Sequence, residues 1–164
     1  LFLNNEIRYY YAATNICHSR RWELCSQSAG VGMASIKPDR FVGLAAEDIE
    51  ATLITMPLKL NFNVEKLFIN ADVSEKGWIK VGVIDENNKF IDGFSPDENI
   101  PILKSNISSE VKWINVSNEG FSESLIQNKR LRLYIKAKNA VIYSIFLIEN
   151  NKINESKYFD FQPM

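Results

Sequence analysis

Histidine, cysteine and serine are the side chains through which this chain could carry out nucleophilic catalysis or hold a transition metal. His18 is the only histidine, so a Ser-His-Asp or Cys-His arrangement would have to use it. It lies in a polar stretch beside Ser19 and two arginines, where a solvent-exposed loop histidine is the ordinary outcome. One histidine and two cysteines spaced Cys-x₇-Cys do not match a known zinc pattern. We therefore predict no catalytic residue and no metal site in this chain.

Two short segments contain the residue types of cation-binding and phosphate-binding loops. The run Asp85 to Asn88 offers oxygen ligands, but it lacks the spaced acidic positions of an EF-hand. A turn between two strands explains it better. Gly30-Val31-Gly32 has neither the spacing nor the following helix of a phosphate-binding loop. The sequence therefore predicts that no cofactor is bound.

Cys17 and Cys25 are eight positions apart in an irregular polar segment. In an oxidising compartment they would close a disulfide, which the chain-entropy model values at about 2.5 kcal/mol for a loop of this size. In a reducing compartment they would be two free, buried thiols. Three glycosylation sequons, at Asn106, Asn115 and Asn154, do not decide between these cases, because a sequence this rich in Asn and Ser produces sequons by chance. We expect a bridged Cys17–Cys25 pair and an extracellular or secreted protein.

The tryptophans are the candidates for a binding surface, because a flat aromatic ring presents apolar area to a sugar. Trp113 lies in an alternating apolar run, so we expect it in the core. Trp78 has the opposite parity to Ile79 and Val81 and is therefore expected to point outward. Trp22 belongs to the polar segment that holds the cysteines. We predict Trp78 and Trp22 as carbohydrate contacts, with packing inside the fold as the competing explanation.

The stretch from Lys129 to Ile148 predicts the longest β-structure of the chain. In its first half, apolar residues alternate with polar ones, which is typical of a strand with one side in water. The second half is too apolar to have a wet face, as in a central strand. We predict that Lys138-Asn139 forms a hairpin turn between the halves, because Asn tolerates the positive φ of tight turns. A second hairpin turn is expected at Ser74 to Gly77.

Short strands separated by turn residues fill most of the remaining sequence. There is no convincing long helix and no internal repeat, so we predict an all-β fold, an antiparallel two-sheet β-sandwich of jelly-roll-like form. The side chains expected inside it are Leu67, Val81, Val83, Leu131, Leu133 and Ile135. The expected strands, besides the two halves of the long stretch, are residues 7–13, 31–36, 41–46, 51–55, 58–62, 66–71, 78–84, 89–91 and 111–116.

Composition and charge exclude several classes of partner. A chain of 164 residues is the size of one domain. Its 19 basic and 20 acidic residues give a net charge of −1, so we expect no nucleic-acid partner, because there is no basic stripe to hold a phosphate backbone. The longest apolar stretch, Ala140 to Ile148, is about half of what a membrane span needs. We therefore expect no membrane span either.

Several motifs occur along the chain in an order that is more specific than any one of them. They are Ile7 to Tyr11, Gly32 to Leu44, Thr55 to Leu58, Leu67 to Asp72, Val81 to Asp85, Gly93 to Ser95, Trp113, Arg130 to Leu133 and Tyr143 to Phe146. This order resembles the carboxy-terminal β-sandwich that follows the five-bladed propeller of invertase- and levanase-like glycoside hydrolases, and more closely that of related bacterial proteins. Arg40 departs from the family pattern, which commonly has glycine before the Phe-Val pair.

The resemblance implies a non-catalytic role. In such enzymes two carboxylates on the propeller carry out the glycosidic chemistry, and no residue of this chain corresponds to them. The sandwich is implied to be an accessory domain that packs on an upstream catalytic propeller and, in some members, contacts sugar or a second subunit. We therefore expect this chain alone not to be an enzyme. A self-standing lectin-like or adhesin-like module is the alternative.

The resemblance also implies a division of the chain. Residues 1–13 would be the remnant closing strand of the upstream domain, residues 14–149 the β-sandwich, and residues 150–164 a C-terminal tail. We interpret the sequence as a piece cut or processed from a longer protein. A strand without its sheet is a template for association, so we expect weak homo-oligomerisation or poor order before Thr14.

Overall fold

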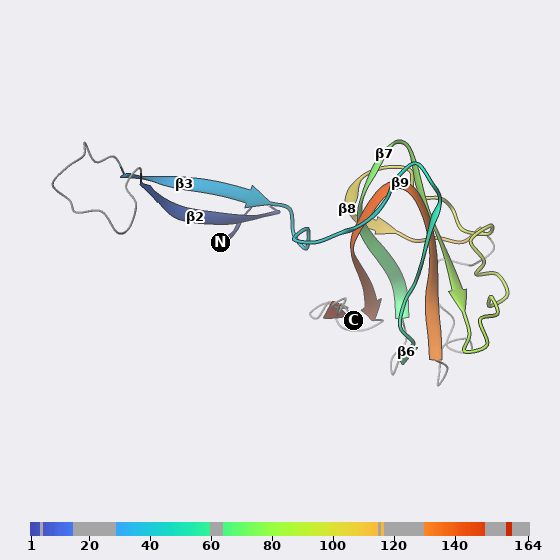
Figure 1. The fold of residues 1–164 in the computed structure, drawn as a ribbon. Helices are drawn as coiled ribbons and strands as arrows, with labels where there is room; N and C mark the ends of the chain where they lie inside the picture. The colour runs from blue at the N-terminus through green and yellow to red at the C-terminus, as the bar shows by residue number, and fades with distance from the viewer. Residues whose placement is uncertain are drawn as a thin grey trace. The chain divides into compact units, whose positions relative to one another are not determined.

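The computed structural model describes residues 1–3, 5–14, 29–59, 64–114, 116, 130–149 and 157–158. None of these residues lies in a helix, so the described part of the chain contains no helix that could cross a membrane. Every strand pairing is antiparallel, and the predicted all-β fold is confirmed (Figure 1). The strands are β1 (Phe2–Leu3), β2 (Glu6–Thr14), β3 (Ala29–Ile36), β4 (Leu44–Ala46), β5 (Ala51–Ile54), β6 (Leu58–Lys59), β7 (Val64–Ile84), β8 (Asn106–Glu110), β9 (Arg130–Glu149) and β10 (Lys157–Tyr158).

The chain divides into two compact units, Leu1–Phe41 and Val42–Met164. The first unit contains a sheet of order β1-β2-β3, and the second contains all the other strands. We expected the sandwich to begin at residue 14. The structure places the boundary later in the chain, between Phe41 and Val42. The reason is that β2 pairs with β3 from Ile7 to Thr14, which holds residues 29–36 in the first unit. Residues 29–41 therefore do not belong to the unit that contains the sandwich.

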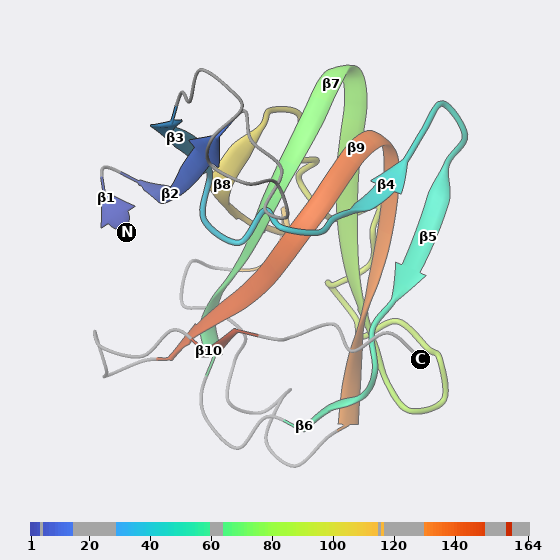
Figure 2. The same ribbon diagram turned by 60° about the vertical axis from the view of Figure 1, so that its left-hand side comes forward.

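β7 and β9 organise the second unit, since each is a long strand that bends back on itself. They pair with one another along almost their whole lengths, with a register shift between Val73 and Trp78. Figures 1 and 2 show each strand as an arch with two legs. One leg of each strand lies in one layer of the sandwich, and the other leg lies in the second layer. β8 extends the layer that contains the first leg of β7. β5 and β6 pair with the first leg of β9, while β4 and β10 pair with the second.

Both predicted hairpin turns are wrong, because the two segments form the bends of the arches. Ser74 to Gly77 lies at the bend of β7, and Lys138-Asn139 lies at the bend of β9. The halves of each strand pair with the other arch and not with each other. A hairpin turn and a sharp bend use the same residue types, glycine and asparagine. Only the pairing partners, which are remote in sequence, distinguish the two.

The bends of the two arches lie in direct contact. A Cβ atom at position 77 would lie only 2.3 Å from the carbonyl oxygen of Asn139, so Gly77 is required by this close approach. Asn139 adopts the positive φ expected of it, 46°. Its amide donates a hydrogen bond of 2.7 Å to the carbonyl of Glu47. The missing side chain of Gly77 therefore allows β7 to bend against β9 without a gap.

The hydrophobic core lies between the two layers. Inward side chains from both legs of both arches form one buried cluster, with Trp113, Val111 and Phe94 from the connecting segments. This burial confirms the core predicted from alternation, and it is complete for Leu67, Val81 and Ile135, at 0% exposure. The predicted residues, all buried, are Leu67, Val81, Val83, Leu131, Leu133 and Ile135.

Candidate functional site

Several residues that the sequence singled out lie outside the described residues. These are Cys17, His18, Trp22 and Cys25. The disulfide and the sugar contact of Trp22 therefore stay predictions. Within the ranges that the structure describes, no group of three His, Cys, Asp or Glu side chains could hold a metal ion.

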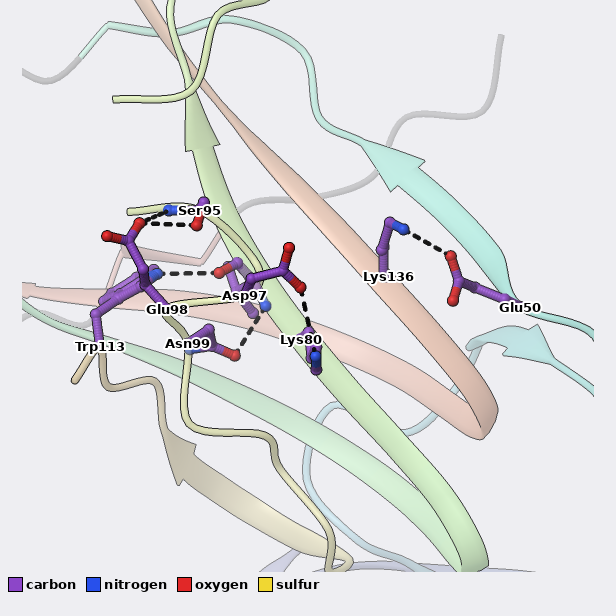
Figure 3. A network of polar contacts seen from close by, with 9 residues as sticks. Glu50, Lys80, Ser95, Asp97, Glu98, Asn99, Trp113 and Lys136 are labelled. Carbon is purple, nitrogen blue, oxygen red and sulfur yellow. Dashed lines mark hydrogen bonds and ion pairs between the residues drawn. The ribbon is translucent and has the colours of Figure 1, made fainter. Parts of the chain in front are cut away.

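Trp113 is buried, as predicted, and its indole ring binds the backbone of β7 (Figure 3). Its Nε1 donates a hydrogen bond of 3.0 Å to the carbonyl of Val81. Asn99 is also buried, and its Oδ1 accepts a hydrogen bond of 2.9 Å from the amide of Val81. The Nδ2 of Asn99 donates one of 2.8 Å to the carbonyl of Lys112. Trp113 and Asn99 are therefore structural residues that replace a partner strand at this point.

Backbone hydrogen bonds cover the same edge of β7 on either side of Val81. Ile79 exchanges two hydrogen bonds with Ile102, of 3.0 and 2.9 Å. The amide of Val83 donates to the carbonyl of Phe94 at 2.8 Å, and its carbonyl accepts from the amide of Ile91 at 2.9 Å. This edge is therefore closed to a further strand, and the second leg of β7 can bind a partner only through its outer face.

Trp78 lies on that outer face, as its parity predicted, next to the first leg of β9. In the antiparallel register Trp78 is opposite Lys138, and Lys80 is opposite Lys136. All of these side chains are partly exposed, whereas the residues between them are buried. We call the outward side chains of these two legs the Trp78 face. They are Trp78, Lys80, Arg132, Tyr134, Lys136 and Lys138.

The Trp78 face places two lysines directly opposite each other. Side chains at such positions lie about 4.5–5.5 Å apart at Cβ, and like charges there are destabilising. The Nζ of Lys80 lies 3.7 Å from Oδ1 of Asp97, and the Nζ of Lys136 lies 2.8 Å from Oε1 of Glu50 (Figure 3). The hydrogen bond that Lys136 donates to the Glu50 carboxylate raises the pKa of Lys136 above its ordinary value. Each of the two opposed lysines therefore has a carboxylate partner.

Aromatic rings lie at both ends of the lysine pair. At one end Tyr134 meets Phe90 edge-on, with ring centroids 5.2 Å apart. Gly82 lies opposite Tyr134, and a Cβ atom there would be 2.9 Å from the Phe90 ring, so glycine leaves room for the ring close to the strand. At the other end the ammonium group of Lys80 lies 5.9 Å from the ring centroid of Trp78, within cation–π range. The Trp78 face thus combines flat apolar rings with cationic donors.

The first unit offers a surface of a different kind, the hairpin of β2 and β3. Strand alternation places Tyr9 and Tyr11 on one face and Tyr10 on the other, and their exposed fractions are 45%, 54% and 56%. Tyr11 lies across Gly32, where a Cβ atom would be 2.4 Å from its ring. Tyr9 meets Phe41 edge-on, with ring centroids 6.3 Å apart. One face of the hairpin is therefore an exposed aromatic layer.

The opposite face of this hairpin is also apolar and exposed. Tyr10 is opposite Met33, and Ala12 is opposite Val31; Met33 and Val31 are both largely exposed. Among the described residues, β3 pairs with β2 on one side and with no strand on the other. We call the two faces and this open edge the hairpin surface. Apolar residues on both faces are typical of a strand that is buried on both faces.

Comparison with known proteins adds no match. No family model, no curated protein and no solved structure corresponds to the chain.

The cations of the Trp78 face were not predicted from the sequence. A net charge of −1 over the whole chain conceals a local group of basic residues. The signal that was available is the alternation of Arg132, Lys136 and Lys138 with buried residues. Lys80, which completes the group, is remote in sequence, and its place follows only from the pairing of β7 with β9.

Proposed function

We propose that this chain is a non-catalytic accessory β-sandwich of a carbohydrate-active enzyme, a glycoside hydrolase. The hairpin surface would attach this accessory domain to the catalytic domain. The hairpin surface is the observation that carries this proposal. A small sheet without a core of its own is marginally stable in water. It gains stability where another sheet pairs with its edge and covers its apolar faces. The motif order supports the same partner, because the strand at residues 7–11 resembles the one that closes a propeller.

The free energy available at the hairpin surface is large enough to hold two domains together. Complete burial of a large apolar side chain contributes about 1.5–3 kcal/mol. Tyr10, Val31 and Met33 lie on a single face and are 56%, 79% and 53% exposed, so burial of what remains exposed would contribute about 3–6 kcal/mol. When both domains belong to one polypeptide, the entropy cost of association is reduced, because the effective concentration is high. Backbone hydrogen bonds along the open edge of β3 would then fix the register.

The carboxylates near the Trp78 face support a non-catalytic role. A glycosidase needs one carboxylic acid with a raised pKa as general acid. Glu50 and Asp97 are paired with lysines. Glu98 accepts hydrogen bonds from the hydroxyl and amide of Ser95, at 2.7 and 3.0 Å, and these bonds lower its pKa. These environments suit carboxylates that organise loops.

The coding sequence directly upstream of the codon for Leu1 tests the proposal. Five propeller blades that carry a pair of carboxylates would support it. A signal peptide directly before Leu1 would contradict it and favour a self-standing module.

An activity assay on the purified chain gives a second test. We expect no hydrolysis of sucrose, inulin, levan or arylglycosides. Turnover that persists in independent preparations, and that is lost on mutating one of the chain's own carboxylates, would overturn the accessory role.

A self-standing lectin-like or adhesin-like module is the second candidate, and the Trp78 face favours it. This face combines partly exposed rings with hydrogen-bond donors, as sugar-binding sites do. The two candidates differ in the hairpin surface. An accessory domain would bury it against a catalytic neighbour, whereas a self-standing module would leave it in solvent or pair it with a second copy.

A further inference from the structure

The charge distribution of the Trp78 face goes against the pairing rules of a β-sheet. Lys80 and Lys136 are directly opposite, and Lys138 follows Lys136 on the same face, about 7 Å further along the strand. Such an arrangement costs stability unless something offsets the repulsion. Local rules of this kind are commonly broken at functional sites. Ion pairs with Asp97 and Glu50 offset part of this repulsion, and Lys138 adds a further positive charge to the same face.

Cations outnumber carboxylates among the described residues of this face. Lys80 and Lys136 have Asp97 and Glu50 as ion-pair partners. Arg132 instead donates a hydrogen bond to the neutral side-chain oxygen of Asn88. With Lys138 the face carries a local surplus of positive charge on a chain whose net charge is −1. A negatively charged ligand is the natural complement of such a surface.

The two ion pairs have different strengths. The Lys136–Glu50 contact is 2.8 Å, whereas the Lys80–Asp97 contact is 3.7 Å and the Asp97 side chain is 96% exposed. An exposed pair of this kind contributes at most about 1 kcal/mol, so a ligand anion can replace Asp97 at little cost. Glu50 would remain and would keep Lys136 in position. The face therefore presents one lysine that is ready to exchange partners and one that is held in place.

We propose that the Trp78 face binds an acidic polysaccharide. One sugar ring stacks on Trp78, and the carboxylate or sulfate of the polymer lies between Lys80, Lys136 and Lys138. This inference depends on the carbohydrate-contact part of the proposed function and adds the class of ligand. Uronate and sulfate groups are alternative sources of the same chemistry, an anion on a pyranose ring, and the experiment below distinguishes them.

Carbohydrate fits this face better than nucleic acid does. Proteins that hold a nucleic-acid backbone neutralise many phosphates with an extended basic surface, whereas the basic group here consists of Lys80, Arg132, Lys136 and Lys138. A single partly exposed indole next to a compact cationic group matches one sugar ring with one anionic substituent. A neutral sugar would make no use of opposed lysines.

Affinity electrophoresis and calorimetry of the intact chain test the proposal. The probes are polygalacturonate, the same polymer with its carboxylates reduced to alcohols, dextran sulfate, unmodified dextran and single-stranded oligothymidylate. We expect binding to polygalacturonate or to dextran sulfate that exceeds binding to the matching neutral polymer at least tenfold and weakens with salt. Binding to polygalacturonate but not to dextran sulfate identifies the carboxylate as the recognised group. Binding to dextran sulfate but not to polygalacturonate identifies the sulfate. Equal binding to charged and neutral polymers, tighter binding to oligothymidylate, or no binding at all would overturn the proposal.

Matched variants locate the site. Trp78→Ala and Lys136→Gln should each weaken binding about tenfold, the factor for one lost charge-assisted hydrogen bond or ring contact. Lys66→Gln is the control, because it also removes a lysine from an ion pair, with Glu110 at 3.3 Å, but in the other layer. Thermal unfolding of each variant confirms that it is folded. If Lys66→Gln weakens binding as much as Lys136→Gln, the site is not the Trp78 face.

The outcomes separate this inference from the proposed function. An acidic ligand can fail to bind while the hairpin surface still docks on a catalytic domain. The upstream coding sequence tests only whether such a catalytic domain is present. Binding of neutral and acidic polymers with equal affinity would contradict only the charge preference and would leave a sugar-contacting accessory domain.

Discussion

Replacement of Asn99 by alanine should destabilise the second unit more than any other change of a single polar side chain on the covered edge of β7. Asn99 is 2% exposed, and its side chain satisfies the amide of Val81 and the carbonyl of Lys112. A buried backbone group left without a partner costs about 1–3 kcal/mol. The amide of Val81 would lose this partner, whereas the carbonyl of Lys112 would keep the hydrogen bond of 2.8 Å from the amide of Ile100. One unpaired buried amide, together with one lost hydrogen bond of about 1 kcal/mol, therefore predicts about 2–4 kcal/mol of lost stability. Trp113 would still bind the carbonyl of Val81, so the fold itself should persist.

Thermal and urea unfolding of Asn99→Ala measure this effect. At about 4 °C per kcal/mol for a unit of this size, the midpoint should fall by about 8–16 °C with an unchanged urea m-value. Asn106→Ala is the matched control, because Oδ1 of Asn106 also accepts a hydrogen bond from a backbone amide, that of Ser108, but in an exposed position. It should lose no more than about 1 kcal/mol. If the two variants lose the same stability, the buried hydrogen bonds of Asn99 do not hold the edge of β7.

Three further predictions concern the bend, acid stability and the cysteines. Gly77→Ala should cost about 1–3 kcal/mol in urea unfolding, because its Cβ atom would overlap a backbone carbonyl 2.3 Å away at the bend of β9; an unchanged midpoint would contradict the close approach. The hydrogen bond from Lys112, at 3.0 Å, holds the pKa of Glu110 below 4.5, so its stabilising effect is present above pH 4.5 and is lost as the pH falls through the lowered value. Glu110→Gln should therefore show a shallower loss of melting temperature between about pH 5 and pH 3, and an identical slope would argue against it. Cys17 and Cys25 should be bridged in the native protein under oxidising conditions, which two titratable thiols would refute.

The sequence predicted the core well because burial follows directly from alternation. Leu131, Leu133 and Ile135 are separated by polar residues, and this period of two places them on one face whatever the strand pairs with. The pairing itself is not a local property. The sharp bend at Asn139 has the residue chemistry of a turn, so the two halves of β9 were predicted to pair with each other, and only the long register with β7 shows otherwise.

The elements that the sequence missed are those whose hydrogen bonds come from unexpected partners. β8 is not among the expected strands, because Pro96 and Pro101, which block regular structure, lie in the segment just before it. The edge of β7 is covered at Val81 by the side chains of Asn99 and Trp113, and no sequence rule predicts a side chain in the place of a strand. The outward direction of Trp78 was predicted correctly from its parity. Its cationic neighbours were not predicted, because their position beside Trp78 depends on the cross-strand register of β7 and β9.

The most direct test of the central claim is hydrogen exchange at the amides of β3 that point away from β2. The hairpin surface is proposed to dock on a catalytic neighbour, so these amides should exchange rapidly in the dilute chain. They should become protected when the chain is expressed together with the upstream coding region, and Tyr10→Ser with Val31→Ser should abolish that protection while leaving the second unit folded. Full protection of Ile7 to Ala13 and of β3 in a chain that sedimentation shows to be strictly monomeric would contradict the proposed docking, because these amides would then be covered without any neighbour.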